Sequence, residues 1–255
     1  MANVKLYGYS TSPYVRKLRC FLYYKGIDFT YVPVSPLKPR ATIGHTNGTQ
    51  VPVLEVDGEW RRESSDHARW LDEIFPEKPL YPAGHRAKID EIDHWISDKY
   101  LLSLFRIAID GSFDKQYVLR SWRLAALVNA DSPLPWWVRL IWPLGLRRSP
   151  FIQHMAQHLD LTESHEDMRA RLLSELVAHI GKGPFMGGLD HPTMLDLAVF
   201  PQLVFNYMFG LEEELSAAKN PEIKAWLQRV SQHLPDNPTL AADNMQVHAL
   251  SEALT

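Results

Sequence analysis

The sequence predicts an α/β domain followed by an all-α domain, and three observations support this. In the first 80 of the 255 residues, short β-prone runs alternate with helical patterns. Three prolines then fall within residues 76–82, which is typical of a stiff connector between domains. Beyond the connector, apolar residues recur at helical spacing. We therefore expect one domain at residues 1–80 and another at residues 83–255.

The first domain begins with a strand, a helix and a second strand. Residues 4–9 form a β-prone run, and Ser12 followed by Pro13 is a typical helix start. Residues 29–34 predict the second strand, and Pro33 within it favours the edge of the sheet. Because a helix connects the two strands, they should be parallel.

A hairpin and a second helix complete this domain. The runs at 51–56 and 59–61 flank an Asp-Gly pair, which is a strong hairpin signal. Pro52 cannot donate a ladder hydrogen bond, so it marks an edge, a bulge or a cis bond. Ser64, with the serine after it, can cap the helix that follows.

The second domain is predicted to be helical throughout. Four apolar stripes, each on one helix face, predict four helices, at residues 89–96, 172–177, 198–207 and 223–230. The segment from about 110 to 160 fits no pattern. From residue 236 onward the chain is polar and carries no stripe, so no element is predicted there.

Residues 132–148 hold three tryptophans and three arginines. This segment could lie in a membrane interface, roof an apolar substrate pocket, or pack in the core or a dimer interface. All three alternatives remain open from the sequence.

The junction between the first strand and the first helix is a candidate anion site. Hydroxyls cluster at Tyr9, Ser10 and Ser12, where the helix N-terminus directs free N–H groups into the same space. The thiolate of a bound small thiol is a suitable anion. A helix terminus supplies up to about 2 kcal/mol and a hydroxyl hydrogen bond about 1.5–3 kcal/mol, enough to lower a thiol pKa by about two units. The alternative is that Ser12 is a simple helix cap.

Several segments together resemble the cytosolic glutathione transferase superfamily. Residues 12–19 match its S/C-P-[YF]-x-x-[KR]-[VL]-R helix start, and residues 50–54 match its x-V-P-x-L strand. Glu63 and Ser64 match the start of its next helix, and residues 181–198 resemble its capping-box helix. The C-terminal half is also similar to membrane-associated prostaglandin E synthase type 2, a branch that has a Cys-Pro-x-Cys site where this chain has serine and valine.

The resemblance implies a thioredoxin-like domain, a C-terminal helical-bundle domain and a glutathione site. Val51 would pair its backbone with the cysteinyl part of glutathione beside a cis Pro52. Glu63 and Ser64 would hold the γ-glutamyl end, and Gln50 the glycyl carboxylate. Glutathione would be the co-substrate, and a homodimer is expected.

Ser12 occupies the position of the family's activating Ser or Cys, with Tyr7, Tyr9 and Ser10 as nearby alternatives. A serine cannot form the mixed disulfide of the cysteine-type members. We therefore expect glutathione to attack a small hydrophobic electrophile, or to support an isomerisation. A second hypothesis is a non-enzymatic binding or regulatory protein with this fold.

Composition excludes several other classes. The net charge of −3 does not suit nonspecific binding of nucleic acid. No run of 18 apolar residues is present, so no transmembrane segment is expected. The single Cys20 cannot form an internal disulfide and is expected to pack in the core; with no secretory signal in the sequence, this fits a cytoplasmic protein. His154 and His158 lack a marked third ligand, so no metal is expected.

Overall fold

Four strands form one mixed sheet in the computed structural model, which describes residues 2–62, 64–240 and 242–255. They run in the order β2-β1-β3-β4. β1 is parallel to β2 and antiparallel to β3, and β3 and β4 form the predicted hairpin. The parallel pairing of the first two strands is confirmed. The strands are β1 (Val4–Gly8), β2 (Thr30–Pro33), β3 (Val53–Val56) and β4 (Glu59–Arg61).

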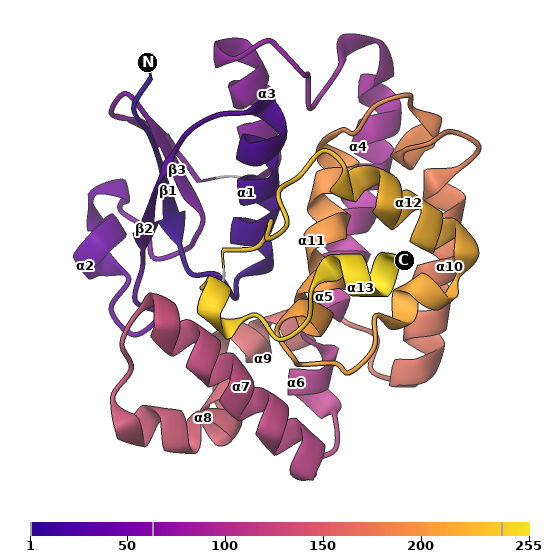
Figure 1. Cartoon of the computed structure of the whole chain (residues 1–255). Coiled ribbons are helices and arrows are strands. Elements are labelled where there is room, and N and C mark those ends of the chain that lie inside the picture. The colour runs from indigo at the N-terminus through magenta and orange to yellow at the C-terminus, as the bar shows by residue number, and fades with distance from the viewer. Residues whose placement is uncertain (1, 63, 241) are drawn as a thin grey trace.

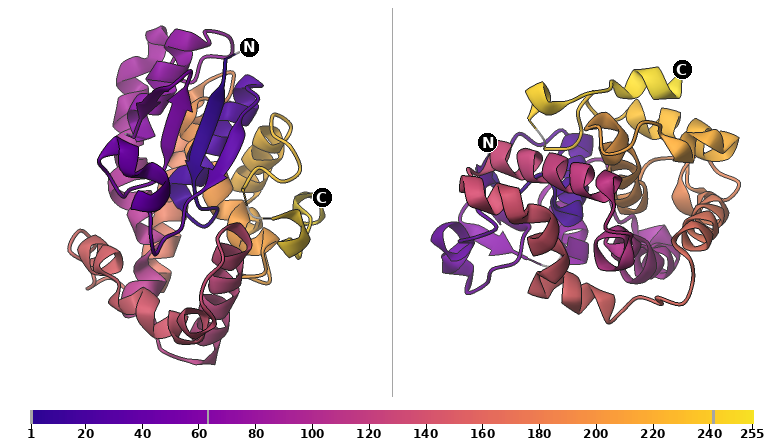
Figure 2. Two further views of the ribbon diagram at one scale, coloured as in Figure 1. Left: turned by 90° about the vertical axis from the view of Figure 1, so that its left-hand side faces the viewer. Right: turned by 90° about the horizontal axis from the view of Figure 1, so that it is seen from below.

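Helices cover the sheet unequally (Figures 1 and 2). On one face, Leu6 and Leu54 join the main core with α1 (Pro13–Lys25) and α3 (Ser64–Ile74). On the other, Tyr7 and its neighbours form a small cluster with Ile43 at the end of α2 (Arg40–Ile43). This division follows from the two-residue period of a strand, which sends Leu6 and Tyr7 to opposite faces.

The rest of the chain is helical. The first predicted stripe lies in α4 and continues into the π-helical turn Ile96–Tyr100, and the other three lie in α10, α11 and α12. Among the described residues, no helix is long and apolar enough to cross a membrane. The helices are α4 (Arg86–Trp95), α5 (Leu101–Ser103), α6 (Arg106–Asp110), α7 (Lys115–Asp131), α8 (Trp136–Arg148), α9 (Pro150–Ala156), α10 (His165–Ile180), α11 (Met194–Met208), α12 (Pro221–Ser231) and α13 (Leu250–Leu254).

α11 is the central helix of this half, and it starts with the predicted capping box between Thr193 and Asp196. The buried Asp196 carboxylate also accepts hydrogen bonds from the Met186 N–H at 2.9 Å and the Trp226 indole N–H at 2.8 Å. Burial raises the pKa of Asp196 to about 6, although these donors act in the opposite direction. Asp196 therefore joins α11 to α12 and to the turn before α11.

Two segments without a predicted element are ordered in the structure. The first forms the antiparallel pair α7 and α8, which stands at one end of the molecule (Figure 2). The second, the polar tail, ends in α13, whose Leu250 and Leu254 lie in the main core. The tail also receives a hydrogen bond from the Cys20 Sγ to the Pro238 carbonyl at 3.6 Å.

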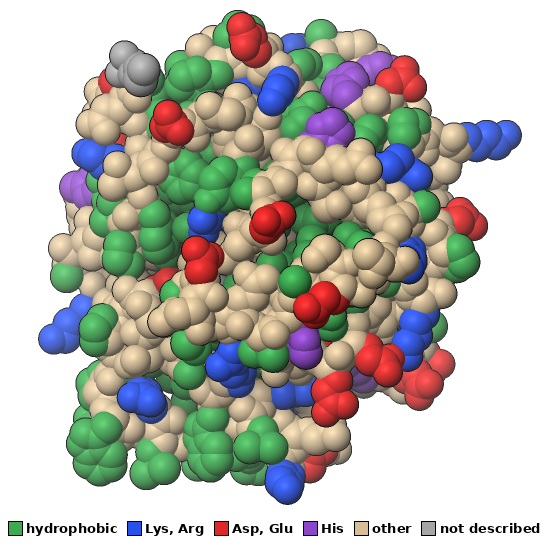
Figure 3. Space-filling view, viewed as in Figure 1, with side chains coloured by type: hydrophobic (Ala, Val, Ile, Leu, Met, Phe, Trp, Pro, Cys, Tyr) green, Lys and Arg blue, Asp and Glu red, His purple; other side chains and the backbone are tan. Residues whose placement is uncertain are grey.

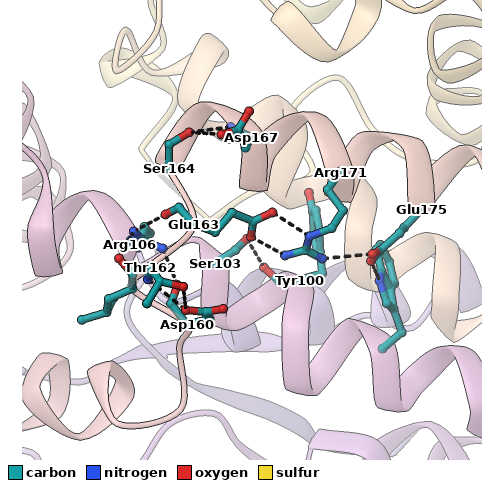
Figure 4. A network of polar contacts seen from close by, with 12 residues as sticks. Tyr100, Ser103, Arg106, Asp160, Thr162, Glu163, Ser164, Asp167, Arg171 and Glu175 are labelled. Carbon is teal, nitrogen blue, oxygen red and sulfur yellow. Dashed lines mark hydrogen bonds and ion pairs between the residues drawn. The ribbon is translucent and has the colours of Figure 1, made fainter.

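The connection between α9 and α10 is fastened by arginines (Figure 4). Buried Arg106 donates to the backbone carbonyls of Asp160 and Glu163, each at 2.7 Å. Arg171 forms ion pairs with Glu163 at 2.8 Å and with Glu175 at 3.0 Å. Charged hydrogen bonds thus fix this loop where few apolar side chains are available.

Candidate functional site

The loop of residues 9–12 leads from β1 into the N-terminus of α1. Gly8 ends the strand so close to α1 that an added Cβ would clash with Cγ2 of Val15. The Ser12 N–H donates to the Tyr9 carbonyl at 3.0 Å, and the Ser12 carbonyl accepts from the Arg16 N–H at 3.1 Å. This tight turn brings the free N–H groups of the first helical turn to the end of the sheet.

Ser12 is the N-cap residue of α1 by position, but its side chain forms no cap hydrogen bond. Its backbone is extended, with φ −76° and ψ 123°, and Pro13 follows as the first helical residue. The residue is 5% exposed. A hydroxyl at a helix N-terminus that does not cap the helix is free to donate to a ligand there. This geometry favours the ligand role of Ser12 over the simple cap.

The alternative hydroxyls are placed differently. The Tyr7 hydroxyl donates to Glu55 at 2.8 Å, and that carboxylate also pairs with Lys5 at 2.7 Å. Tyr7 belongs to the cluster on the face of the sheet opposite α1. Ser10 is completely buried, and burial raises the pKa of the Tyr9 hydroxyl. Ser12 is therefore the hydroxyl best placed at the helix start.

Asp131, at the end of α7, was not expected at this site. Its carboxylate accepts from the Ser10 N–H at 2.6 Å and from the Tyr31 hydroxyl at 3.2 Å. Burial is the main cause that raises the pKa of Asp131, and the contacts with Ser10 and Tyr31 oppose it. The contact spans 121 residues of sequence, so no local pattern could have indicated it. Asp131 holds the loop from the helical half of the chain.

Arg16 places a buried positive charge one turn into α1. Its guanidinium donates to Gln202 Oε1 at 2.7 and 3.1 Å and to the Thr11 carbonyl at 3.3 Å, and its Cζ lies 3.8 Å from the centre of the Phe205 ring. Burial lowers the pKa of Arg16 to about 9. The charge is retained at neutral pH, so it adds to the preference of the helix start for an anion.

The sheet register brings the predicted glutathione-binding segments to the same end of the sheet, the end at which β1 leads into α1. Val53 lies opposite Tyr7 in the β1–β3 pair, so the preceding Val51 and Pro52 lie beside the loop that leads to Ser12. The Val51–Pro52 bond is cis, as the family resemblance implied; the strand pattern alone had left an edge, a bulge or a cis bond open. Gln50, before them, is exposed.

The start of α3 lies at the same end of the sheet. Arg61 at the end of β4 lies opposite Leu54, and α3 begins at Ser64. Glu63 lies outside the described residues, and the Ser64 side chain is also not among the described groups. His67 joins the helix to the strand, because its Nε2–H donates to the Arg61 carbonyl at 3.0 Å. Burial lowers the pKa of His67 to about 4.

Cys20 is buried, and burial raises the pKa of its thiol to about 12, so it is a packing residue as predicted. His154 and His158 are exposed, with ring centres 5.1 Å apart. In the part of the chain that the structure describes, no group of three His, Cys, Asp or Glu side chains is arranged to hold a metal.

Comparison with known proteins agrees with the resemblance found in the sequence. Residues 6–79 match the family model of the glutathione S-transferase N-terminal domain. Over 284 aligned positions, the chain is 24% identical to prostaglandin E synthase 2 of Danio rerio, covering 91% of this chain and 72% of that protein.

Solved structures share the fold of both halves. The beta-etherase of a Sphingobium species aligns with a TM-score of 0.60 at 21% identity, covering 90% of this chain and 95% of its own. A maleylacetoacetate isomerase from Anaeromyxobacter dehalogenans, with bound dicarboxyethyl glutathione and citrate in its active site, aligns with a TM-score of 0.53 at 21% identity and 95% coverage of each chain. The predicted thioredoxin-like domain followed by a helical domain is confirmed.

Proposed function

Because the chain belongs to the glutathione S-transferase superfamily, we propose that it binds glutathione as a co-substrate and transfers it to a small hydrophobic electrophile. The observation that supports this most directly is the Ser12 hydroxyl, which lies at the start of α1 without forming a cap hydrogen bond. A thiolate bound there would receive the hydroxyl hydrogen bond and the field of the helix N-terminus together.

In the proposed reaction, the glutathione thiol loses its proton to solvent and the Ser12 hydroxyl donates to the resulting thiolate. The sulfur then attacks the electrophilic carbon, a C–S bond forms, and the leaving group departs with its bonding electrons. The buried charge of Arg16 supports the thiolate at longer range, because its burial limits screening by water.

We assign glutathione binding to residues 1–80. In this proposal the Val51 backbone beside cis Pro52 pairs with the cysteinyl part, and Gln50 holds the glycyl carboxylate. Glu63 and Ser64 hold the γ-glutamyl end. Residues 83–255 supply the electrophile site, and the proposal includes a homodimer and a cytoplasmic location.

A glutathione-dependent isomerisation is the second candidate. The structural neighbour named as a maleylacetoacetate isomerase, with its bound glutathione derivative, favours it. In an isomerisation the sulfur would add to the substrate and leave again, so the same stabilisation of the thiolate by Ser12 would serve both reactions.

Calorimetric titration with glutathione, combined with conjugation of an aryl halide and isomerisation of a cis-enedione, tests the proposal. We expect saturable glutathione binding and turnover in one of the two assays. Binding without turnover of any electrophile would support the non-enzymatic alternative. Absence of glutathione binding would refute the proposed function.

A further inference from the structure

A strip of apolar side chains lies exposed on α8. The helix turns Val138 and Pro143 inward, and the Pro143 carbonyl accepts a hydrogen bond from the buried Tyr117 hydroxyl of α7 at 2.9 Å. Five other apolar residues are each 46–74% exposed. Their spacing of one, three and four residues places them on one side of the helix. We call them the α8 face: Trp136, Trp137, Leu140, Ile141 and Leu144.

The α8 face continues onto α7. Trp122 is 42% exposed, and its indole N–H donates to the Leu140 carbonyl at 3.2 Å. Figure 3 shows hydrophobic side chains gathered at the end of the molecule where α7 and α8 lie. Single exposed apolar residues are ordinary, but a contiguous patch marks an interaction surface. The core-packing alternative is therefore wrong for these side chains.

The segment around the α8 face is also positively charged. Residues 132–159 contain three arginines and no Asp or Glu, although the whole chain has a net charge of −3. Arg139 and Arg148 are exposed, and Arg147 donates to the backbone carbonyls of Ala108 and Gly111. Among the side chains that the structure describes, no carboxylate lies at ion-pair distance from any of these three arginines.

We propose that the α8 face docks the protein on the surface of an anionic phospholipid bilayer. Tryptophan side chains suit the boundary between lipid headgroups and acyl chains, and leucine and isoleucine side chains can enter the apolar layer beneath. Arginines beside them can reach the lipid phosphates and carboxylates. The 13 residues of α8 are fewer than the roughly 20 needed to cross a bilayer, so the helix lies in the interface.

A second copy of the chain fits this surface less well. A two-fold interface sets the same patch against itself. That arrangement would bring Arg139 and Arg148 of both copies together in a segment that offers no carboxylate of its own. An anionic lipid surface supplies the missing negative charge.

Vesicle flotation with the whole chain tests the proposal, using phosphatidylcholine vesicles with and without added phosphatidylserine. We expect binding to the phosphatidylserine vesicles, weakened by added salt, with a blue shift of tryptophan emission. The double variant Trp136→Ser/Trp137→Ser should bind at least about tenfold more weakly, since two aromatic rings no longer enter the interface. Arg139→Gln/Arg148→Gln should bind the phosphatidylserine vesicles about fivefold more weakly for each charge removed.

Leu37→Ser/Val247→Ser is the matched control, because these two apolar residues are similarly exposed but lie outside the α8 face. It should bind vesicles as the unmodified chain does, and thermal melts will verify that every variant folds. Failure of the unmodified chain to float with anionic vesicles would overturn the proposal, as would equal binding by the Trp variant. A dimer that dissociates in the Trp variant, without lipid binding, would assign the α8 face to contact between copies. None of these outcomes depends on glutathione binding or turnover.

Discussion

Ser10 and Ser12 lie two residues apart in one loop, but their surroundings differ. Ser10 is completely buried, and its N–H is held by Asp131. Ser12 stands at the helix start, where its hydroxyl forms no cap bond. The sequence identified the cluster of hydroxyls but could not rank its members, because their ranking depends on contacts with a residue that lies 121 positions away.

We expect Ser12→Ala to raise the pH midpoint for thiolate formation by bound glutathione, measured from thiolate absorbance in the near ultraviolet. Losing a hydrogen bond to a charged sulfur, worth about 1.5–3 kcal/mol, corresponds to roughly one to two pH units. Ser10→Ala is the matched control and should leave the midpoint unchanged. A shift in the Ser10 variant alone would transfer the role to Ser10.

The hydrogen bonds that Asp131 accepts from Ser10 and Tyr31 should stabilise the fold. Removing the carboxylate in Asp131→Ala leaves the Ser10 N–H without its acceptor, so the free energy of unfolding should fall by about 1–3 kcal/mol. A double-mutant cycle with Tyr31→Phe should give a coupling energy of about 1 kcal/mol. Additive effects of the two substitutions in urea unfolding would contradict a direct hydrogen bond.

At the scale of elements, α1 and α11 are held together by polar groups as well as by apolar packing. Gln202 of α11 accepts from the Arg16 guanidinium and donates to the Pro13 carbonyl at 2.9 Å. The helical half therefore fixes the first turn of α1, where the thiolate is proposed to bind.

We expect Gln202→Ala to lower the free energy of unfolding by about 2–3 kcal/mol, since the buried guanidinium of Arg16 loses its amide acceptor. Gln157→Ala is a suitable control, because that glutamine is exposed at the end of α9. Denaturant titration of both variants provides the measurement. Equal stability of the two would show that the Arg16–Gln202 contact contributes little.

The elements that the sequence predicted are those with local signals. Ser12 before Pro13 marked the start of α1, an Asp-Gly pair marked the hairpin, and Thr193 with Asp196 marked the start of α11. α8 was not predicted, because Pro143 lies inside it and most of its large apolar residues face solvent. The tail was not predicted either, because its order depends on distant partners such as Cys20.

At the scale of the whole molecule, one continuous core contains residues of the sheet, α1, α11 and the tail. Lys17 of α1 adds a buried ion pair with Asp93 of α4 at 3.2 Å. Because the two halves share this core, we expect them to unfold together in one transition.

Two buried groups should then oppose each other in the pH dependence of stability. The pKa of His67 is lowered to about 4, so its contribution to stability is lost as the pH falls from 6.5 to 4. The pKa of Asp196 is raised to about 6, so its contribution is present at low pH and is lost as the pH rises from 3.8 to 6. Each amounts to about 3 kcal/mol, so the two largely cancel between pH 4 and 6.

Urea unfolding of single variants from pH 4 to 7 should distinguish the contribution of His67 to stability from that of Asp196. His67→Gln should gain stability relative to the unmodified chain as the pH falls from 6.5 to 4. Asp196→Asn should lose relative stability, by about 3 kcal/mol, as the pH falls from 6 to 4. Parallel pH profiles for both variants and the unmodified chain would show that neither carries a shifted pKa.

Because Cys20 is buried, the reactivity of its thiol reports how often this region of the native chain opens. It is the single cysteine of the chain, it is completely buried, and its protonated thiol contacts the Pro238 carbonyl of the tail. An alkylating reagent reacts with the thiolate, so it can label the protein only after this region has opened. The rate at which Cys20 is alkylated, measured from the intact mass of the protein, therefore reports how often the contact between the two halves opens. A cysteine introduced at an exposed position would react without any opening, and so it would serve as the internal standard for the reactivity of the reagent in the same molecule.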